Sequence, residues 1–374
     1  MKVLVTGANG FLAKNLISHL NFRDDIEVIP YTRQNQISDL QDMLVGVEMI
    51  FHLAGANRPS DQKQFELDNE DLTRTLCAEV RRHAFHHNYK IPIVFSSSIR
   101  ATEPSSYGKS KFRAETCLRE LEQEGFSIFV FRLPNVFGKW SRPNYNSVVA
   151  TFCHNIAHDI PIRVDEESRN LSLVYIDDVV NSFLMLLNRE NIIIGDNGFV
   201  DVQPVYTVTL GKLAETLCAF KENRQKLHVS NVGTGFMRAL YSTFISYMPT
   251  NHFQYSVTGH VDERGRFVEM IKTETAGQIS YFTAAPGVTR GGHFHHTKVE
   301  KFMVVAGKAK ITFRNILSNE VKSMTVNAQT PEIIETIPGW AHNIENMGQS
   351  ELIVLAWANE VFDPQNADTV QVSV

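Results

Sequence analysis

Cysteine is scarce in this sequence. The four cysteines, Cys77, Cys117, Cys153 and Cys218, all lie in the first two-thirds of the 374 residues, and no two of them form a CxxC pair. A disulfide-stapled scaffold needs paired cysteines, and a zinc ribbon needs closely spaced ones. The sequence therefore indicates neither, and we expect the protein to work in a reducing compartment.

An excess of one charge and long apolar runs are also missing. The chain has 36 basic and 41 acidic residues and a formal net charge of -5, which argues against a nucleic-acid partner. The longest apolar runs, such as IVFSSSI and LIVLAWA, are much shorter than the roughly 18 residues of a membrane helix. The chain also starts in a predicted strand rather than in a leader peptide. We expect a soluble, cytoplasmic protein with no membrane partner.

The two parts of the chain have different sequence patterns. Its 374 residues suffice for two or three domains of about 150 residues each. In the first part, apolar strands alternate with helical periodicity, which is typical of parallel βαβ units in a doubly wound, Rossmann-like α/β fold. From about Met248 only short strands and turn signals remain, which indicates an all-β barrel or sandwich. We predict domains at 1–247 and 253–374. The expected strands of the first domain are 2–6, 26–31, 49–53, 94–96 and 129–132, and its first two helices are 10–20 and 38–44.

The first predicted strand leads into a glycine-containing loop with the sequence TGANGFLA, from Thr6 to Ala13. Gly7 permits a tight turn, and Gly10 lets a pyrophosphate approach the N-terminus of the next helix, where free N–H groups favour an anion. Ala13 replaces the usual third glycine and still allows close helix packing. Taken alone, the loop could equally be an ordinary strand–helix turn. A dinucleotide site would use Gly7, Asn9, Gly10, Phe11 and Leu12.

The segment Tyr107-Gly-Lys-Ser-Lys111 contains a catalytic pattern. Residues four apart lie one turn apart on a helix face, so we expect Lys111 to lower the pKa of Tyr107 and let the phenol exchange a proton with a carbonyl or alcohol. Upstream, Ser96-Ser97-Ser98 ends a strand and offers a hydroxyl to the same oxygen. A lone YxxxK is more often a solvated helix face. The order of glycine loop, serine-ended strand and YxxxK favours the catalytic interpretation.

The end of the second predicted strand indicates the cofactor. It reads Pro30-Tyr31-Thr32-Arg33-Gln34, whereas an acidic residue there would accept from the ribose 2′-hydroxyl of NAD and repel a 2′-phosphate. Arg33 suits the phosphate and therefore favours NADPH, with Asp39 as a candidate contact to the adenine. The alternative is that Arg33 is only a solvated loop cation.

Further stretches complete this pattern: Phe51-His52-Leu53-Ala54-Gly55, Asn69, Arg132 to Gly138 (RLPNVFG) and Val174 to Val179 (VYIDDV). With them, the first domain resembles the extended short-chain dehydrogenase/reductase family, in its nucleotide-sugar branch. The resemblance implies that Tyr107 gives a proton to a ketone, that Lys111 tunes it and binds the nicotinamide ribose, and that Ser98 polarises the carbonyl. Ser97 stays an alternative to Ser98, because three consecutive serines leave the register open. The resemblance also puts Leu53 and Ala54 at the cofactor.

The second domain carries three histidines and a glutamate: His293, His295, Glu300 and His342. Strand alternation points His293 and His295 to the same face, into a predicted barrel. Three imidazoles and a carboxylate suit a divalent transition ion, and we predict Zn²⁺. A lone histidine would more often be a core residue, whereas four fitting residues favour a metal site. Their spacing resembles both motifs of the cupin family, which implies a cupin barrel.

Two segments of the second domain, 262–269 and 288–293, resemble the paired motifs of cupin-class epimerases that act on nucleotide-linked 4-keto-6-deoxyhexoses. The resemblance implies that arginines hold the nucleotide diphosphate and makes His293 the base. A metal-bound His293 could not take a proton, so either the metal activates the C–H beside the ketone or the base lies elsewhere. The family's late tyrosine acid is absent from 352–357 (LIVLAW). The substrate residues implied are Arg264, Phe267, Glu269 and Arg290.

Over its whole length, the chain resembles bifunctional bacterial enzymes of capsule and O-antigen biosynthesis. That resemblance implies C3 epimerisation of a UDP-4-keto-6-deoxy-HexNAc by the cupin. Reduction of the C4 ketone with NADPH would then give UDP-2-acetamido-2,6-dideoxy-L-talose, on the route to UDP-N-acetyl-L-fucosamine. It also implies a homodimer formed through the cupin. The alternatives are a monofunctional reductase with a structural cupin and a non-catalytic nucleotide-sugar or NADP sensor.

Overall fold

The computed structural model describes residues 1–374 except 58–60, 62–64, 189–194, 196–197, 253–256, 296–297, 317, 338 and 366. The described residues pack as two compact units, one of Met1–Leu217 with Ala239–Met248 and one of Cys218–Arg238 with Pro249–Val374. The predicted domain ranges, 1–247 and 253–374, stay a prediction, and the first four residues of the second range lie outside the described residues.

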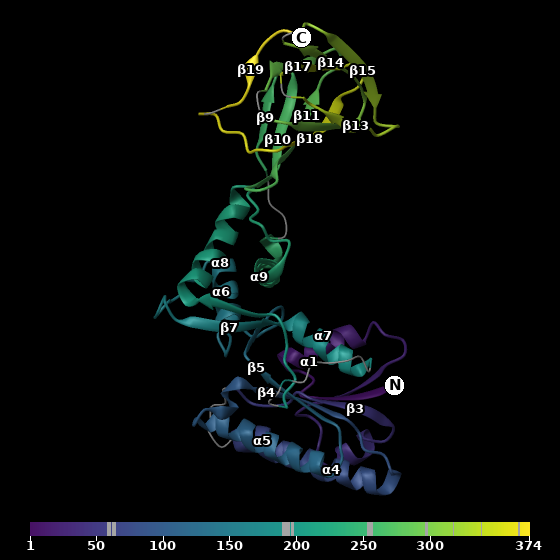
Figure 1. Cartoon of the computed structure of the whole chain (residues 1–374), viewed down its shortest axis with the longest axis vertical. Helices are drawn as coiled ribbons and strands as arrows, with labels where there is room; N and C mark the ends of the chain where they lie inside the picture. Colours follow the sequence, from purple (N-terminus) through teal and green to yellow (C-terminus); the bar gives the residue numbers. More distant parts are fainter. Residues whose placement is uncertain are drawn as a thin grey trace. The chain divides into compact units, whose positions relative to one another are not determined.

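The first unit is built on a parallel sheet with the strand order β2-β1-β3-β4-β5 (Figure 1). Every pair of neighbouring strands in it is parallel. Val3, Leu4 and Val5 are wholly buried, as expected for a parallel strand covered on both faces. The predicted Rossmann-like fold is confirmed. The strands are β1 (Lys2–Thr6), β2 (Glu27–Tyr31), β3 (Val47–His52), β4 (Ile93–Ser98) and β5 (Ile128–Leu133).

Helices cover both faces of this sheet. Figure 1 shows α4 (Leu72–His87) and α5 (Ser106–Gln123) on one face and α1 (Phe11–Leu20) and α7 (Ile176–Leu187) on the other. A small second sheet has the order β6-β7-β8, from Asn135–Phe137, Asn170–Tyr175 and Val205–Thr209. The other helical segments are α2 (Asp39–Met43), η1 (Glu66–Asp71), η2 (Ile99–Thr102), α6 (Val148–Ala157), α8 (Leu210–Gln225), α9 (Gly235–Ile245) and η3 (Thr250–His252). Within the described part of the chain, no helix has the length and apolar character needed to cross a membrane.

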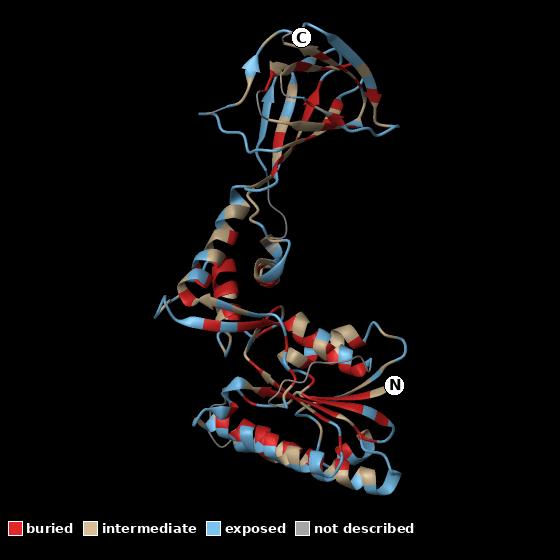
Figure 2. Cartoon of the chain, viewed as in Figure 1, coloured by how far each residue is buried: buried red, intermediate tan, exposed pale blue. Residues whose placement is uncertain are grey.

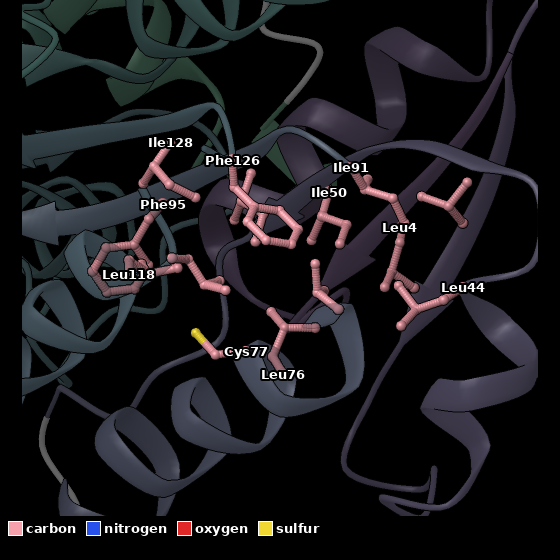
Figure 3. Close-up of a cluster of buried hydrophobic side chains, with 14 of the residues drawn as sticks. Leu4, Leu44, Ile50, Leu76, Cys77, Ile91, Phe95, Leu118, Phe126 and Ile128 are labelled. Atoms are coloured by element: carbon pink, nitrogen blue, oxygen red, sulfur yellow. The ribbon is translucent and has the colours of Figure 1, made fainter. Parts of the chain in front are cut away.

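The main apolar core of the first unit lies between the sheet and the pair α4 and α5. Leu4 and Ile50 of the sheet meet Leu76 and Leu118 of these helices, and all four side chains are almost completely buried (Figure 3). Figure 2 shows the strands of this sheet mostly as buried, because helices cover both faces. This packing fixes the carboxyl ends of the strands, where the residues of the predicted reductase site lie.

The second unit is a barrel of two antiparallel sheets (Figure 1), with the orders β16-β13-β18-β11-β10-β9 and β15-β14-β17-β12-β19. Burial alternates along β18, so one side chain in two faces the core (Figure 2). The predicted cupin barrel is confirmed. Its strands are β9 (Gly259–Asp262), β10 (Gly265–Thr273), β11 (Gly277–Ala284), β12 (Thr289–Phe294), β13 (Glu300–Ala306), β14 (Lys308–Asn315), β15 (Val321–Asn327), β16 (Ile334–Glu335), β17 (Trp340–Asn346), β18 (Leu352–Ala358) and β19 (Val370–Gln371).

The segment after α8 groups with the barrel through backbone hydrogen bonds. The N–H of Lys272 donates to the carbonyl of Leu227 over 2.7 Å, and the N–H of Val229 donates to the carbonyl of Lys272 over 2.8 Å. These bonds extend the edge of the barrel by a short parallel bridge at His228.

Candidate active site and metal centre

The glycine loop joins the end of β1 to the N-terminus of α1. Gly7 has a φ of +66°, and a Cβ there would lie 2.6 Å from the Cα of Ala54, so only glycine fits where the ends of β1 and β3 pass each other. Gly10 caps α1 and donates its N–H to the carbonyl of Gly7 over 2.7 Å. The predicted cofactor residue Asn9 lies in this loop, and Phe11 and Leu12 begin the first turn of α1.

His52 ties this loop to the sheet and to α4. Thr73 donates its hydroxyl to the carbonyl of Asn69 over 2.6 Å, so its oxygen must accept from Nε2 of His52, 2.8 Å away. Nδ1 of the neutral ring then accepts from the hydroxyl of Thr6 at 2.7 Å, and Thr6 in turn accepts the N–H of Ala54 at 3.2 Å. Burial, aided by the charge of Lys111, lowers the pKa of His52 to about 3. The ring is therefore neutral, and the donor and the acceptor of each of these hydrogen bonds are fixed.

Asn69 connects the same region to α5. Its side-chain oxygen accepts the N–H of Ala56 at 2.9 Å, and its amide donates to the carbonyl of Ala56 and to the hydroxyl of Ser110, at 3.1 and 2.9 Å. Ser110 donates to the carbonyl of Tyr107 at 2.8 Å. A Cβ on Gly55 would lie 2.7 Å from the Asn69 oxygen. Asn69 thus positions the first turn of α5 against the cofactor-side loop.

Lys111 is buried at the end of β4. Its ammonium donates to the carbonyl of Ser96 over 2.9 Å and lies 4.9 Å from the centre of the Phe95 ring. Burial lowers the pKa of Lys111 to about 8, against the opposing charge of Glu115. Burial disfavours the charged form of an amine, which is why the pKa of this ammonium falls.

Tyr107 stands one turn earlier on α5. Burial raises the pKa of Tyr107, while a hydrogen bond with the side chain of Ser98 and the charge of Arg100 act in the opposite direction. The expectation that Lys111 lowers the pKa of Tyr107 is therefore wrong for this structure, because desolvation outweighs the cationic contributions and the contributing cation is Arg100. The phenol is held protonated, as a proton donor requires.

The structure separates the roles of the two candidate serines. Ser97 donates its hydroxyl to Glu115 over 2.5 Å, and Glu115 also receives two hydrogen bonds from Arg132, at 3.0 and 2.6 Å. Glu115 is only 4% exposed, so this carboxylate is paired inside the fold. The hydroxyl of Ser97 is thus engaged by that pair, whereas the Ser98 side chain acts on the pKa of Tyr107, which favours Ser98 as the hydroxyl at the ketone.

Arg33 and Asp39 both follow β2 in the chain, but they bond to different partners. Arg33 is exposed, and its guanidinium donates to a carboxylate oxygen of Asp68 over 2.7 Å. Asp39 begins α2 and accepts the N–H of Gln36 over 2.8 Å. Arg33 is accessible to a 2′-phosphate, which would compete with the carboxylate of Asp68.

The four predicted metal ligands converge inside the barrel. His293 on β12 is directly opposite His342 on β17, and β13 starts with Glu300. The ligand atoms of His293, His295, Glu300 and His342 all lie within 4.8 Å of one another. One carboxylate oxygen of Glu300 lies 3.2 Å from Nε2 of His295 and 3.5 Å from Nε2 of His342.

The donor chemistry of this cluster fits a divalent cation. The backbone carbonyl of Asp368 can only accept, so His295 must carry its proton on Nδ1, and its Nε2 lone pair faces the carboxylate of Glu300. Nδ1 of His342 is buried without a hydrogen-bond partner among the described residues. Burial and the neighbouring histidines lower the pKa of His293 to about 4. Burial raises the pKa of Glu300, but the surrounding histidines and Lys298 outweigh it, so the pKa of this carboxyl lies well below its ordinary value. Neutral imidazoles around an ionised carboxylate are the ligand set of Zn²⁺.

The predicted substrate residues of the cupin divide into two groups. Arg264 forms a two-pronged contact with Asp262, at 2.5 and 3.0 Å, and Arg290 lies 4.0 Å from the same carboxylate. Arg290 also donates to the carbonyl of Thr283 over 3.0 Å. Burial and the charge of Arg264 lower the pKa of Arg290. The two guanidinium groups form one cationic patch.

Glu269 and Phe267 do not join this patch. Glu269 forms an ion pair with Lys272 at 2.7 Å and accepts from Gln278 at 3.2 Å. Phe267 packs against the apolar core of the barrel. For these two residues the described contacts support a structural role.

Comparison with known proteins agrees with this two-unit architecture. The model of the NAD dependent epimerase/dehydratase family matches residues 3–196, and the model of the polysaccharide biosynthesis C-terminal domain matches residues 260–370. The chain belongs to the NAD dependent epimerase/dehydratase family. It is 49% identical over 375 residues to the UDP-2-acetamido-2,6-beta-L-arabino-hexul-4-ose reductase of Pseudomonas aeruginosa, covering 100% of this chain and 99% of that protein.

Solved structures extend the comparison to the whole fold. The capsular polysaccharide assembling protein CapF from Staphylococcus aureus superposes with a TM-score of 0.92 at 39% identity and covers 100% of both chains. A UDP-glucuronic acid 4-epimerase from Bacillus cereus matches 60% of this chain and 85% of its own length, with a TM-score of 0.51 and 18% identity. The second comparison shows the fold alone. The first shows that the order of epimerase/dehydratase unit and barrel is shared by a full-length relative.

Within this family fold, sequence reasoning missed the contacts that support α5. Glu115 and Ser110 lie on the buried face of α5 and bond to Ser97 and Asn69. A carboxylate on the apolar face of an amphipathic helix was the available signal, because such a group needs a buried partner. Its partner Arg132 comes from another strand, and the helix sequence does not name it.

Proposed function

We propose that this chain is a two-site enzyme of polysaccharide biosynthesis that acts on a UDP-linked 4-keto-6-deoxy-N-acetylhexosamine. The first unit reduces the C4 ketone with NADPH, and the cupin epimerises C3 beforehand. The product is UDP-2-acetamido-2,6-dideoxy-L-talose, on the route to UDP-N-acetyl-L-fucosamine. The observation that carries the reductase is the placement of Tyr107 and Lys111 one turn apart on α5, with the buried Lys111 bonded to the carbonyl of Ser96 on β4, the strand that ends at Ser98. The full-length relative of this chain is named as such a reductase.

The residues of the first unit provide the proton and the electrostatics of ketone reduction. NADPH, when bound, supplies the hydride to C4. Tyr107 gives its phenolic proton to the ketone oxygen, which becomes the new hydroxyl, and Ser98 donates a hydrogen bond to the same oxygen. Lys111 stabilises the phenolate that Tyr107 leaves behind. Gly7 and Gly10 let the pyrophosphate approach the end of α1.

The preference for NADPH rests on Arg33. Its guanidinium is 83% exposed and pairs with the carboxylate of Asp68, which shows that it can hold an anionic oxygen at that position. A 2′-phosphate carries more charge than a carboxylate and offers more acceptor oxygens, so it would displace Asp68. Asp39 remains the proposed contact to the adenine.

In the second unit, His293, His295, Glu300 and His342 would hold a Zn²⁺ ion, which can polarise the C4 ketone and acidify the C3 hydrogen. Arg264 and Arg290 would bind the diphosphate of the nucleotide. If His293 binds the metal, it cannot accept the C3 proton, so another residue must be the base. We also propose that two chains pair through their cupins in the cytoplasm.

A second candidate function is a monofunctional reductase with a structural cupin. The strand at 352–357 (LIVLAW) favours it, because no tyrosine stands there to act as the acid of an epimerase. The two candidates differ in one reaction, the exchange of the C3 hydrogen with solvent.

Incubating the purified protein with the UDP-4-keto sugar in heavy water tests both. Without NADPH, the two-site enzyme incorporates deuterium at C3, and with NADPH it also consumes the reduced cofactor. Cofactor oxidation without deuterium at C3 would identify the monofunctional reductase. A protein that does neither, although it binds both ligands, would be a sensor.

A further inference from the structure

The end of the chain runs alongside the metal-ligand strand. β19 pairs with β12 in antiparallel register, with Gln371 opposite His293 and Val370 opposite Phe294. Beyond β19, the N–H of Val372 donates to the carbonyl of Gly292 over 2.9 Å. β12 is therefore held between β17, which carries His342, and β19 at the edge of the sheet.

Asp368, just before β19, contacts the metal cluster directly. Its backbone carbonyl accepts the Nδ1–H of His295, and its carboxylate accepts the N–H of Lys298 over 2.8 Å. The first bond fixes the tautomer of His295 and turns Nε2 toward Glu300. The second holds the segment that leads into Glu300. One residue of the C-terminal segment thus orients two of the four ligands.

The other end of this segment is anchored on the barrel. The guanidinium of Arg314, on β14, donates two hydrogen bonds to the carbonyl of Ser373, over 3.0 and 2.6 Å. We call the segment from Asp368 to Ser373 the strap. It is fixed at both ends and lies along β12 between them.

The strap adds little to the apolar core. Val370 is 40% exposed, and Gln371 is exposed. The core cluster of the barrel is formed by residues between Phe282 and Ala356, all of which precede the strap. Burial of apolar surface therefore does not explain why the chain end is held at this place, whereas the bonds to His295 and to β12 do.

We propose that the strap is the outer shell of the metal centre and that it sets the affinity of the four-ligand site by fixing His295 and β12. This inference rests on the proposed metal centre. Residues that hydrogen-bond to metal-bound histidines fix their ring orientation, and their loss typically weakens metal binding by about 10- to 100-fold. The strap orients His295 through the backbone carbonyl of Asp368. A side-chain substitution does not remove that carbonyl, so deletion of the segment is the direct test.

The test compares the full chain with a variant that lacks residues 368–374. Zn²⁺ affinity is measured by competition with a chromophoric chelator, and metal content by elemental analysis. We expect affinity to fall about 10- to 100-fold, while the circular dichroism of the barrel and NADPH binding by the first unit are retained. Gln371→Ala is the matched control, because its exposed side chain can be removed without loss of the strap backbone.

Two point variants keep the test informative if the truncated chain misfolds. Asp368→Ala removes the bond to Lys298, and Arg314→Met releases Ser373, and both leave the strap in the chain. Each should weaken Zn²⁺ binding several-fold. Unchanged affinity in a folded truncated chain, or in both point variants, overturns the strap proposal alone. A full chain that binds no Zn²⁺ overturns the metal centre, and the strap proposal with it.

Discussion

Single residues carry the proposed reductase chemistry. Burial raises the pKa of Tyr107 and keeps the phenol protonated, and Lys111 is the buried cation of the site. Each of these residues serves only the proposed reductase, so single substitutions can separate ketone reduction from C3 epimerisation.

Replacing Tyr107 by phenylalanine should abolish reduction of the ketone and leave solvent exchange at C3 intact. The phenol serves only the first unit, and loss of a proton donor typically slows a reaction by about 10² to 10⁴. Oxidation of NADPH and deuterium at C3 are measured on the same sample. Tyr89→Phe is the control, since its hydroxyl donates to the exposed carbonyl of Glu48, on the far end of β3 from the glycine loop. Normal reduction by Tyr107→Phe would remove this residue from the mechanism.

Arg33→Ala should raise the KM for NADPH much more than the KM for NADH. The charge-assisted contact to the 2′-phosphate is lost, whereas NADH never makes it. Arg23→Ala serves as the control, because Arg23 pairs with Asp25 away from the end of β2. Equal changes in both KM values would show that another residue selects the cofactor.

Lys111→Met should remove activity and yet raise the stability of the first unit at neutral pH. The pKa of Lys111 in the folded chain is about 8, below the ordinary lysine value of 10.5, so the unfolded chain binds more protons between these values. Stability must therefore rise with pH from about 8 to 10.5 in the wild type, as the buried charge is lost, by roughly 3 kcal/mol. Denaturant unfolding at several pH values measures this. The advantage of the variant should shrink across that window, and a stability difference independent of pH would contradict the argument.

At the scale of elements, the site depends on strand ends that nearly touch. β1 and β3 meet at Gly7 and Ala54, and α5 is fixed to the same region through Asn69 and Ser110. The positions of whole elements, rather than any one contact, set the distance between the glycine loop and Tyr107.

Gly7→Ala tests this close approach. Its Cβ would lie 2.6 Å from the Cα of Ala54, whereas a Cβ at Gly46, with a φ of +75°, would meet only a flexible side-chain atom of Lys2 at 3.5 Å. Both variants carry the cost of a left-handed backbone, about 1 to 2 kcal/mol. Gly7→Ala should lower stability by more than Gly46→Ala does. It alone should also weaken binding of the reduced cofactor, which fluorescence titration measures. Equal losses of stability and unchanged cofactor affinity would show that the two ends can separate without consequence.

At the scale of the whole molecule, two units with separate apolar cores carry separate sites. Loss of a ligand from one unit should therefore not unfold the other unit. Metal binding is linked to the folding of the barrel, because only the folded barrel brings the four ligands together.

The double substitution His295→Ala with His342→Ala should release the metal and lower the melting temperature of the barrel. The thermal transition of the first unit should not change. Calorimetry with and without a chelator, beside elemental analysis, measures both effects, and His260→Ala on the exposed strand β9 is the control. We also expect C3 exchange to fall. Full exchange in a metal-free, folded variant would make the metal structural and return His293 to the role of base.

The sequence by itself determined the order of the two folds, the five strands of the parallel sheet and the identity of the converging metal ligands. These features depend on local patterns, such as strand length, glycine at turns and alternation along a strand, which a sequence displays directly. Tertiary structure alone decided which serine faces Tyr107, that Glu115 pairs with Arg132, and that Asp368 holds His295. It also reversed the expected effect on the Tyr107 pKa, because desolvation depends on everything packed around a group and not on its neighbours in the chain.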